Sequence, residues 1–315
     1  MKAIRFHRYG AAEVLRWEET RAPRPGPGQV RVAVHAAALN PKDILTRKGK
    51  MRFVSPGLPH LSGQDLAGVV EAVGPGVRAK RVGERVFGMI GGLGAGACAE
   101  LAVLKASECA LMPRRASMTE AASVPLAGLT ALQALRDLLR VAPGERIVLN
   151  GASGGVGVHA IQIAKILGAH VVAVSSERNL AFVQELGADE VLPYDEAPLV
   201  ERSGSFDGVF DIFGTAPYER ASHLLAPRGR YVSTLPRPRI VLRSMASKVV
   251  PQLEARLVLV RSRARDLARL AQWIDEGRLR PLVDRVWPVE EAADAHRYLE
   301  TKRARGKVVL EVSRA

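Results

Sequence analysis

The sequence predicts an α/β protein of two domains, one rich in β-strands and the other built on a doubly wound parallel sheet. Short alternating apolar stretches dominate residues 1–114, apolar strands alternate with amphipathic helices over 115–255, and an apolar strand ends the chain. Strands that alternate with helices form parallel sheets, because the crossover between parallel strands is right-handed and usually helical. A length of 315 residues is sufficient for two separate cores.

The first domain, residues 1–114, is expected to be a partly open β-barrel. Residues 30–40 alternate apolar and other side chains, and a second strand run over 65–77 ends in a Gly-Pro-Gly turn. A third alternating stretch covers 83–92. Helical periodicity is rare in this part of the chain, which favours a barrel of short strands.

The second domain, residues 115–255, begins with helical spacing over 117–139, for which Ser117 and Thr119 are both candidate N-caps. Alternating strands and helices follow, and Gly168 is a stop signal for the first of these helices. The predicted strands cover 145–151, 170–176, 206–214 and 229–236, and the predicted helices cover 156–168 and 179–188.

The last segment, residues 256–315, is expected to return to the first domain. It contains a predicted strand at 257–260 and helices at 265–277 and 289–300, and it ends in the apolar strand KVVLEV. A strand this apolar must pair with a sheet, and the first domain is the simplest partner.

The most informative motif is the glycine-rich segment GASGGVG at residues 151–157. It follows the apolar run Ile147, Val148, Leu149 and precedes a predicted helix. Glycines let the backbone turn tightly and approach a pyrophosphate, and the helix N-terminus offers free N–H groups to the anion. In this strand–loop–helix context, the motif predicts a Rossmann-type dinucleotide site.

The end of the second strand of this domain indicates which dinucleotide binds. An NAD site usually has an acidic residue there, about 20 residues after the glycine loop. This chain has Ser175 and Ser176, followed by Glu177, Arg178 and Asn179. Neutral hydroxyls and an arginine suit the 2′-phosphate of NADPH, which we therefore expect as the cofactor. Glu177 is expected to be an exposed turn residue, and the alternative is that it serves as the ribose acid of an NAD site.

Tyr194 is a further candidate, and it follows a third strand that comes directly after the predicted helix at 179–188. Its hydroxyl is a donor for the 2′-phosphate, and the alternative is a half-buried core tyrosine.

Several segments together match one family. In chain order they are NPKD (residues 40–43), LSGQDLAGVVEAVG (61–74), VPLAGLTALQAL (124–135), GASGGVG, SSERNLAFVQELGAD (175–189) and AHRYLETKRARGKVVLEV near the end. Over essentially its whole length the chain resembles the medium-chain dehydrogenase/reductase superfamily, and most closely its zinc-free quinone oxidoreductase and alkenal/enone reductase branch. The resemblance implies a GroES-like fold for the first domain and hydride transfer as the activity.

The resemblance also implies positions for the site. Asn40 and Thr130 match residues near the nicotinamide, and no proton donor is assigned, because Gly49, Lys50 and Met51 stand where several relatives carry a tyrosine. The positions that match contacts to the rest of the cofactor are the backbone groups of Gly154, Gly155 and Val156 for the pyrophosphate, and Phe213, Gly214, Ser233, Thr234 and Leu235 for the ribose and carboxamide. Ser153, in the same loop, is a further expected cofactor contact.

A catalytic metal is not expected. Zinc alcohol dehydrogenases of the superfamily carry Cys where Asn40 stands and His where Gln64 stands. A catalytic zinc needs about three nitrogen, sulfur or carboxylate ligands, and Asp43 alone does not hold the ion. Without a Lewis acid, alcohol oxidation is disfavoured, whereas hydride addition to a conjugated acceptor remains feasible.

Composition leaves three functions open. The net charge of +14 raises the possibility of nucleic-acid binding, but the basic residues are spread along the whole chain, which disfavours that function. The favoured hypothesis is an NADPH-dependent reductase of quinones or α,β-unsaturated carbonyls. The alternatives are a reductase module for carrier-bound acyl chains and an NADPH-binding protein with an RNA-binding or docking role.

The sequence also predicts the cellular compartment and the oligomeric state of the protein. Two cysteines, Cys98 and Cys109, exclude a disulfide framework and suit a reducing compartment. No apolar run approaches the roughly 20 residues of a membrane helix, so we expect a cytoplasmic protein without a membrane partner. The apolar residues 257–260 offer an edge strand, and we expect a homodimer that acts on a small-molecule carbonyl or quinone.

Overall fold

The computed structural model describes residues 1–53, 57–92, 94–246 and 255–312. They form two compact units, Met1–Leu129 with Arg261–Ala315, and Thr130–Val260. The first boundary therefore lies after Leu129 rather than after 114. The reason is that helix α2 (Met118–Ala122) packs on strands β3 (Gln29–Ala38) and β5 (Asp65–Val73) of the first unit.

The first unit is built on a seven-stranded sheet in the order β15-β16-β3-β5-β6-β8, with β7 also paired to β3. Strand β3 pairs with β5 along one edge, and its other edge pairs with β7 at one end and with β16 at the other. A smaller sheet has the order β2-β1-β4. The remaining strands are β1 (Lys2–Phe6), β2 (Arg16–Glu19), β4 (His60–Leu61), β6 (Arg85–Met89), β7 (Leu101–Lys105), β8 (Cys109–Leu111), β15 (Val283–Pro288) and β16 (Lys307–Glu311).

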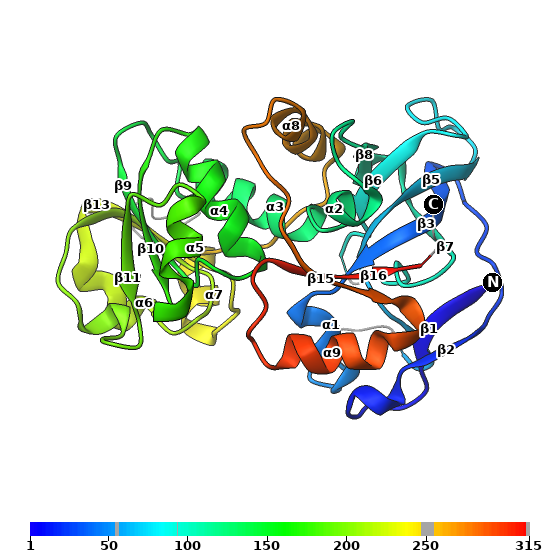
Figure 1. Ribbon diagram of the computed structural model, residues 1–315, viewed down its shortest axis with the longest axis horizontal. Coiled ribbons are helices and arrows are strands. Elements are labelled where there is room, and N and C mark those ends of the chain that lie inside the picture. The colour runs from blue at the N-terminus through cyan, green and yellow to red at the C-terminus, as the bar shows by residue number, and fades with distance from the viewer. Residues whose placement is uncertain (54–56, 93, 247–254, 313–315) are drawn as a thin grey trace. The chain divides into compact units, whose positions relative to one another are not determined.

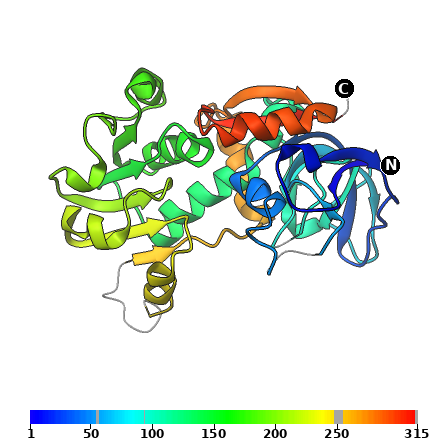
Figure 2. The ribbon, with the colours of Figure 1, turned by 90° about the horizontal axis from the view of Figure 1, so that it is seen from below.

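Three more helices belong to this unit: α1 (Pro41–Arg47), α8 (Ala264–Asp275) and α9 (Ala292–Glu300). Helix α9 packs on β16, on α1 and on the short 3-10 helix Ala12–Val14, and Figure 2 shows this carboxy-terminal part, in orange and red, against the blue amino-terminal part. The end of the chain thus completes the sheet of the first unit. Strand β15, which runs parallel to β16, lies between the helices predicted at 265–277 and 289–300, where no strand was predicted.

The second unit, drawn in green and yellow in Figure 1, contains a six-stranded parallel sheet. Its strand order is β11-β10-β9-β12-β13-β14. This is the Rossmann strand order, in which the direction of winding reverses between the first and fourth strands, here β9 and β12. Helices α4 and α5 pack on β9, β10 and β11, and α7 packs on β14. The elements are β9 (Arg146–Asn150), β10 (His170–Ser175), β11 (Glu190–Pro193), β12 (Phe206–Asp211), β13 (Leu225–Ser233), β14 (Ala255–Leu257), α4 (Gly155–Ile166), α5 (Leu180–Glu185), α6 (Tyr218–Ala221) and α7 (Pro238–Ala246).

The helical stretch predicted over 117–139 is divided in the structure. Helix α2 is capped by Ser117, whose hydroxyl accepts from the Glu120 N–H at 3.2 Å. A new helix, α3, begins at Pro125, because proline is well suited to a first helical turn but not to a helix interior. Helix α3 (Pro125–Leu132) continues into a π-helix over Gln133–Leu138.

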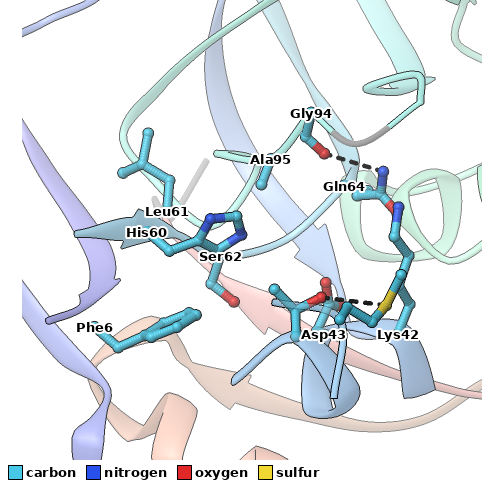
Figure 3. A pocket seen from close by; sticks show the side chains of 11 residues that line it. Phe6, Lys42, Asp43, His60, Leu61, Ser62, Gln64, Gly94 and Ala95 are labelled. Carbon is cyan, nitrogen blue, oxygen red and sulfur yellow. Dashed lines mark hydrogen bonds between the residues drawn. The ribbon is translucent and has the colours of Figure 1, made fainter. Parts of the chain in front are cut away.

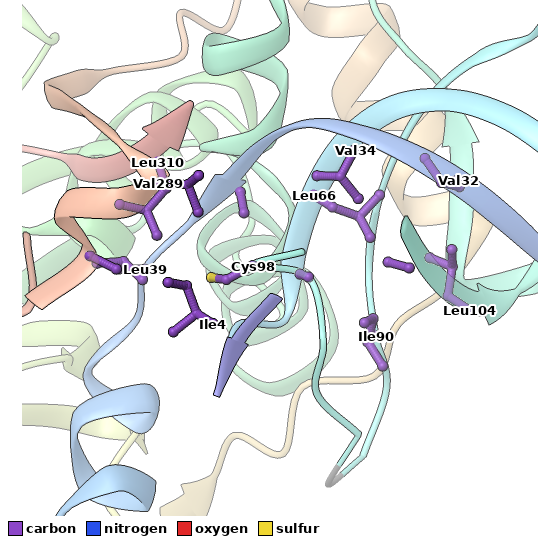
Figure 4. Close-up of a cluster of buried hydrophobic side chains, with 14 of the residues drawn as sticks. Ile4, Val32, Val34, Leu39, Leu66, Ile90, Cys98, Leu104, Val289 and Leu310 are labelled. Carbon is purple, nitrogen blue, oxygen red and sulfur yellow. The ribbon is translucent and has the colours of Figure 1, made fainter. Parts of the chain in front are cut away.

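Each unit has its own apolar core. In the first unit it gathers side chains from the barrel strands, from β16 and from the segment that precedes α9 (Figure 4). Ile4, Leu66 and Leu310 lie in it, although they are far apart in the sequence. In the second unit the core includes Val148, Val172 and other side chains of the parallel sheet.

Candidate functional site

The glycine-rich loop connects β9 to α4, the position at which a Rossmann fold binds the pyrophosphate. Two glycines are required by the loop itself. Gly151 has φ +96°, a left-handed conformation that favours glycine. A Cβ on Gly157 would lie 2.3 Å from the carbonyl oxygen of Gly151 and 2.4 Å from that of Ala152, both backbone atoms. The loop can therefore close on the helix only because residue 157 has no side chain.

Gly154, the N-cap of α4, differs from these two glycines. A Cβ on Gly154 would find its nearest neighbour, the carbonyl oxygen of Gly151, at 3.8 Å, an ordinary contact distance. The fold itself has room for a side chain there. No side-chain cap serves α4. The N–H groups of a first helical turn have no acceptor within the helix, so they remain available to a ligand, together with the positive end of the helix dipole. The arrangement fits an anionic group such as a pyrophosphate.

Polar side chains from β10 and the following turn meet the same loop. The Ser175 hydroxyl donates to the Ser153 hydroxyl at 2.9 Å, and the Asn179 amide donates to it at 3.1 Å. Ser175, Ser176 and Asn179 are buried, whereas Glu177 and Arg178 are exposed in the short 3-10 helix that follows the strand. Glu177 is thus an exposed turn residue, as expected.

The end of β11 adds two more groups beside β10. Tyr194 is half exposed, and its backbone N–H donates to the Ser175 carbonyl at 3.0 Å, so it lies beside the end of β10 rather than in the core. The Asp195 carboxylate accepts from the Glu177 N–H at 2.8 Å. Asp195 was not among the predicted site residues, because nothing in its own segment shows that it lies against the turn after β10.

On the other side of the reversal, the ends of β12 and β13 carry the remaining predicted cofactor contacts. The Asn150 amide donates to Asp211 at 2.7 Å and to the Thr215 hydroxyl at 2.9 Å, which ties the end of β9 to that of β12. The Gly214 N–H also donates to Asp211, at 2.8 Å. Asn150 and Asp211 were missed in the sequence, where they read as ordinary strand ends.

The predicted ribose and carboxamide contacts lie next to this network. The Thr234 hydroxyl donates to the Ile212 carbonyl at 2.8 Å, and the Ser233 hydroxyl accepts from the Leu235 N–H at 3.2 Å. Phe213 is 51% exposed and Leu235 37% exposed, so two large apolar side chains face solvent at the edge where a Rossmann fold holds its ligand.

In the first unit, Asn40 and Asp43 form the N-terminus of α1. The Asp43 carboxylate accepts from the Asn40 N–H at 2.8 Å, so Asp43 caps the helix. Burial raises the pKa of Asp43 to about 6, although the Asn40 N–H opposes the shift; nearby Asp65 contributes to it. Asn40 itself is buried at 2% exposure, and its amide nitrogen donates to Asp65 at 3.0 Å.

A small pocket with both polar and apolar lining opens beside α1 (Figure 3). Its volume of about 20 Å³ is enough for roughly one water molecule. Lys42, Asp43, His60, Ser62 and Gln64 line it with polar groups. The enclosed part of the pocket has room for a water-sized group.

Thr130 is buried at 5% exposure on α3 and is the first residue of the second unit. It follows Leu126 by one helical turn, and the Leu126 N–H donates to Asp65 at 2.9 Å.

Comparisons with known proteins identify the family of this chain. Residues 26–129 match the family model described as "Alcohol dehydrogenase GroES-like domain", and residues 186–310 match the one described as "Zinc-binding dehydrogenase". A curated protein of Arabidopsis thaliana named "Chloroplast envelope quinone oxidoreductase homolog" is 33% identical over 324 residues, which cover 99% of this chain and 98% of that protein. The chain belongs to the medium-chain dehydrogenase/reductase superfamily, in its quinone oxidoreductase branch.

Two further relatives agree with this assignment. A protein of Arabidopsis thaliana named "NADPH-dependent alkenal/one oxidoreductase, chloroplastic" is 34% identical over 321 residues, which cover 98% of this chain and 79% of that protein. The solved structure of a quinone oxidoreductase from Coxiella burnetii superimposes with a TM-score of 0.88 at 33% identity and covers 99% of each chain. This medium-chain reductase therefore has the predicted GroES-like and Rossmann-type folds, and members of the superfamily bind a nicotinamide cofactor.

The name of one family model refers to zinc, and the side chains at the expected ligand positions do not fit that ion. The Gln64 amide nitrogen donates to the carbonyls of Ile90 and Gly94 at 3.0 Å each, so the amide points its donor side at acceptors (Figure 3). The Asn40 amide accepts from Lys307 and donates to Asp65. Neutral amides held in this way, beside an ammonium group, are poor zinc ligands.

Within residues 1–53, 57–92, 94–246 and 255–312, no three His, Cys, Asp or Glu side chains gather as a metal site. No helix in the same part of the chain combines the length and the apolar character needed to cross a membrane.

Proposed function

We propose that this medium-chain reductase uses NADPH to reduce a quinone or an α,β-unsaturated carbonyl compound without zinc. The observation that carries the proposal is the glycine-rich loop at the reversal point of a Rossmann sheet, with an open anion cradle at Gly154. The amide side chains at the positions of the zinc ligands support the choice of acceptor. A conjugated acceptor is already electrophilic, so its reduction does not need a Lewis acid.

In this proposal, separate segments of the chain contact different parts of the cofactor. A bound nicotinamide supplies the hydride. The first turn of α4 and the loop from Ser153 to Val156, which includes Gly155, hold the pyrophosphate. Phe213, Gly214, Ser233, Thr234 and Leu235 border the ribose and the carboxamide. Asn40 and Thr130 are proposed to lie near the nicotinamide, and no side chain is assigned as the proton donor.

The preference for NADPH rests on the end of β10. Ser175, Ser176 and Asn179 offer hydrogen-bonding groups there, Tyr194 lies beside the strand end, and Arg178 is exposed in the turn. A contact to a charged group contributes about 1.5–3 kcal/mol, or about one to two decades in affinity. The Arg178→Ala substitution should therefore raise the KM for NADPH by about tenfold or more and leave NADH kinetics nearly unchanged.

A comparison of NADH with NADPH tests the proposed preference for NADPH. If the unmodified protein uses NADH better than NADPH, the cofactor lies against Glu177 or Asp195 as a ribose acid. Steady-state kinetics with both cofactors, on the unmodified protein and the Arg178→Ala variant, decide between the two.

The test of the reaction itself is NADPH oxidation by the purified chain across a panel of quinones, enones and aldehydes. Turnover of quinones or enones supports the proposal. Turnover only with an acyl chain on a carrier protein supports the carrier-bound alternative. NADPH binding without turnover of any acceptor supports the RNA-binding or docking alternative. The homodimer and the cytoplasmic location also stay predictions.

A further inference from the structure

Lys307, the first residue of β16, is a buried cation in the first unit. Its side chain is 4% exposed, and the carboxylate of Asp65, its charged partner, is fully buried. The sheet register explains why Lys307 lies beside Asp65. Val309 pairs with Ala38 and Ala38 pairs with Asp65, so the start of β16, the end of β3 and the start of β5 lie side by side.

The ammonium group of Lys307 is fully used within the protein. It donates to the Leu39 carbonyl at 2.9 Å, to Asp65 at 3.3 Å and to the side-chain oxygen of Asn40. Since an ammonium group has three N–H donors, none is left for a substrate or cofactor. Lys307 can therefore act on the reaction only through its neighbours.

These contacts hold the Asn40 carboxamide in one orientation. Its oxygen accepts from Lys307, and its nitrogen donates to Asp65 at 3.0 Å. A flip of the amide would set its NH₂ group against the ammonium and its oxygen against the carboxylate. Both contacts would then be repulsive, so the ion pair selects a single rotamer of Asn40.

Asp65 also connects this orientation to α3. Its second carboxylate oxygen accepts from the Leu126 N–H at 2.9 Å, in the first turn of the helix that carries Thr130 one turn further on. One carboxylate thus fixes Asn40 and the start of the helix that bears Thr130. Buried ion pairs contribute little to net stability compared with apolar side chains of similar size, which makes a role in positioning the more economical explanation.

We propose that Asp65 and Lys307 are positioning residues that orient the Asn40 carboxamide for hydride transfer. The inference rests on the proposed function, because it needs Asn40 to lie near the nicotinamide. It predicts an effect on the hydride-transfer step and little effect on the binding of NADPH, whose phosphates are held by the other unit.

The experiment uses the full-length Lys307→Gln variant, with Lys307→Arg as the conservative rescue and Leu104→Ala as a control. Leu104 is a buried core residue of β7 and pairs with Val30, at the opposite end of β3 from Asn40, so its truncation should lower the melting temperature through lost packing. The measurements are the NADPH dissociation constant and stoichiometry, kcat per NADPH-binding site, and the primary deuterium isotope effect with NADPH deuterated at the transferred position.

We expect Lys307→Gln to lower kcat per site by about tenfold or more, the loss typical of one charge-assisted hydrogen bond, and to change the dissociation constant by less than about twofold. Its isotope effect should rise, because hydride transfer becomes more rate-limiting. Lys307→Arg should recover part of kcat, and Leu104→Ala should keep the kcat per site and isotope effect of the unmodified protein.

Other outcomes overturn the proposal. If Lys307→Gln loses thermal stability but keeps the kcat per site and the isotope effect of the unmodified protein, the pair is structural. If Lys307→Gln does not fold, the same measurements are made on the double variant Lys307→Gln with Asp65→Asn, which leaves no unpaired buried charge. The double variant should then show the lower kcat per site and the higher isotope effect. If the unmodified protein binds NADPH but reduces no acceptor, the proposed function fails and this inference with it, and that result is distinguishable because no variant is needed to obtain it.

Discussion

The glycine-rich loop allows a direct test, because the fold excludes a side chain at Gly157 but has room for one at Gly154. At Gly157 a Cβ would meet two backbone oxygens at 2.3 and 2.4 Å. At Gly154 the nearest atom would be 3.8 Å away, so the fold accepts a methyl group there. We predict that Gly154→Ala leaves the fold intact and weakens cofactor binding, whereas Gly157→Ala damages both.

The size of each effect follows from these distances. A contact under 3 Å to backbone must be relieved by moving the loop, which costs about 1–3 kcal/mol and lowers the melting temperature of Gly157→Ala. In Gly154→Ala the methyl group occupies the space that the pyrophosphate needs. The loss of one hydrogen bond to a charged group, about 1.5–3 kcal/mol, corresponds to a roughly 10- to 100-fold higher dissociation constant for NADPH.

The assay is fluorescence titration with NADPH alongside thermal unfolding, and Gly57→Ala is the matched control. Gly57 also has open space around a Cβ and lies in the other unit, so its substitution should change neither quantity. If Gly154→Ala binds NADPH as tightly as the unmodified protein, the pyrophosphate does not lie at the N-terminus of α4, and the reasoning from the open cradle is refuted.

Three other predictions follow from the same structure. The purified protein should carry no stoichiometric zinc and keep its activity in a chelator, since the Asn40 and Gln64 amides are held by protein groups; one zinc per chain by elemental analysis, lost together with activity, would contradict this. Burial, with a smaller effect of Arg47, lowers the pKa of His296 to about 3 from the usual 6.5. The unfolded chain therefore takes up this proton first, and the contribution of His296 to stability is intact above about pH 6.5 and falls below it by up to about 1.4 kcal/mol per pH unit. Between pH 6.5 and 4.5, the free energy of unfolding measured by urea titration should fall less in the His296→Phe variant than in the unmodified protein. An equal fall in both proteins would exclude a contribution of His296 to this pH dependence. Finally, β14 is an edge strand of the parallel sheet, and we predict a homodimer; light scattering that shows only monomer at micromolar concentration would count against it.

Local patterns were enough to predict most of the second unit. The glycine loop, helix α4 with Gly168 (φ +86°) just beyond its C-cap Leu167, and the strands around them follow from residues close in the sequence. Predictions were less accurate where tertiary packing decides the outcome. The strand expected at 257–260 lies at Ala255–Leu257, because pairing with β13 sets its bounds. The short strand β15 was missed because it depends on pairing with β16.

In the candidate site, the contrast between residues that local sequence predicts and contacts that only tertiary packing creates is larger. The amide at Asn40 could be singled out from its own segment, but the groups that hold it could not. Lys307 and Asp65 are 242 residues apart, and in the sequence Lys307 is one of several basic residues near the end of the chain, where a solvated surface charge is the ordinary interpretation. Only the register of β16 against β3, and of β3 against β5, brings the ammonium, the amide and the carboxylate together. A buried lysine with every donor satisfied is a signal that sequence patterns do not carry, because it depends on three strands from distant parts of the chain. The positioning of Asn40 is therefore a property of the folded sheet, and it is the part of the proposed mechanism that most needs the structure.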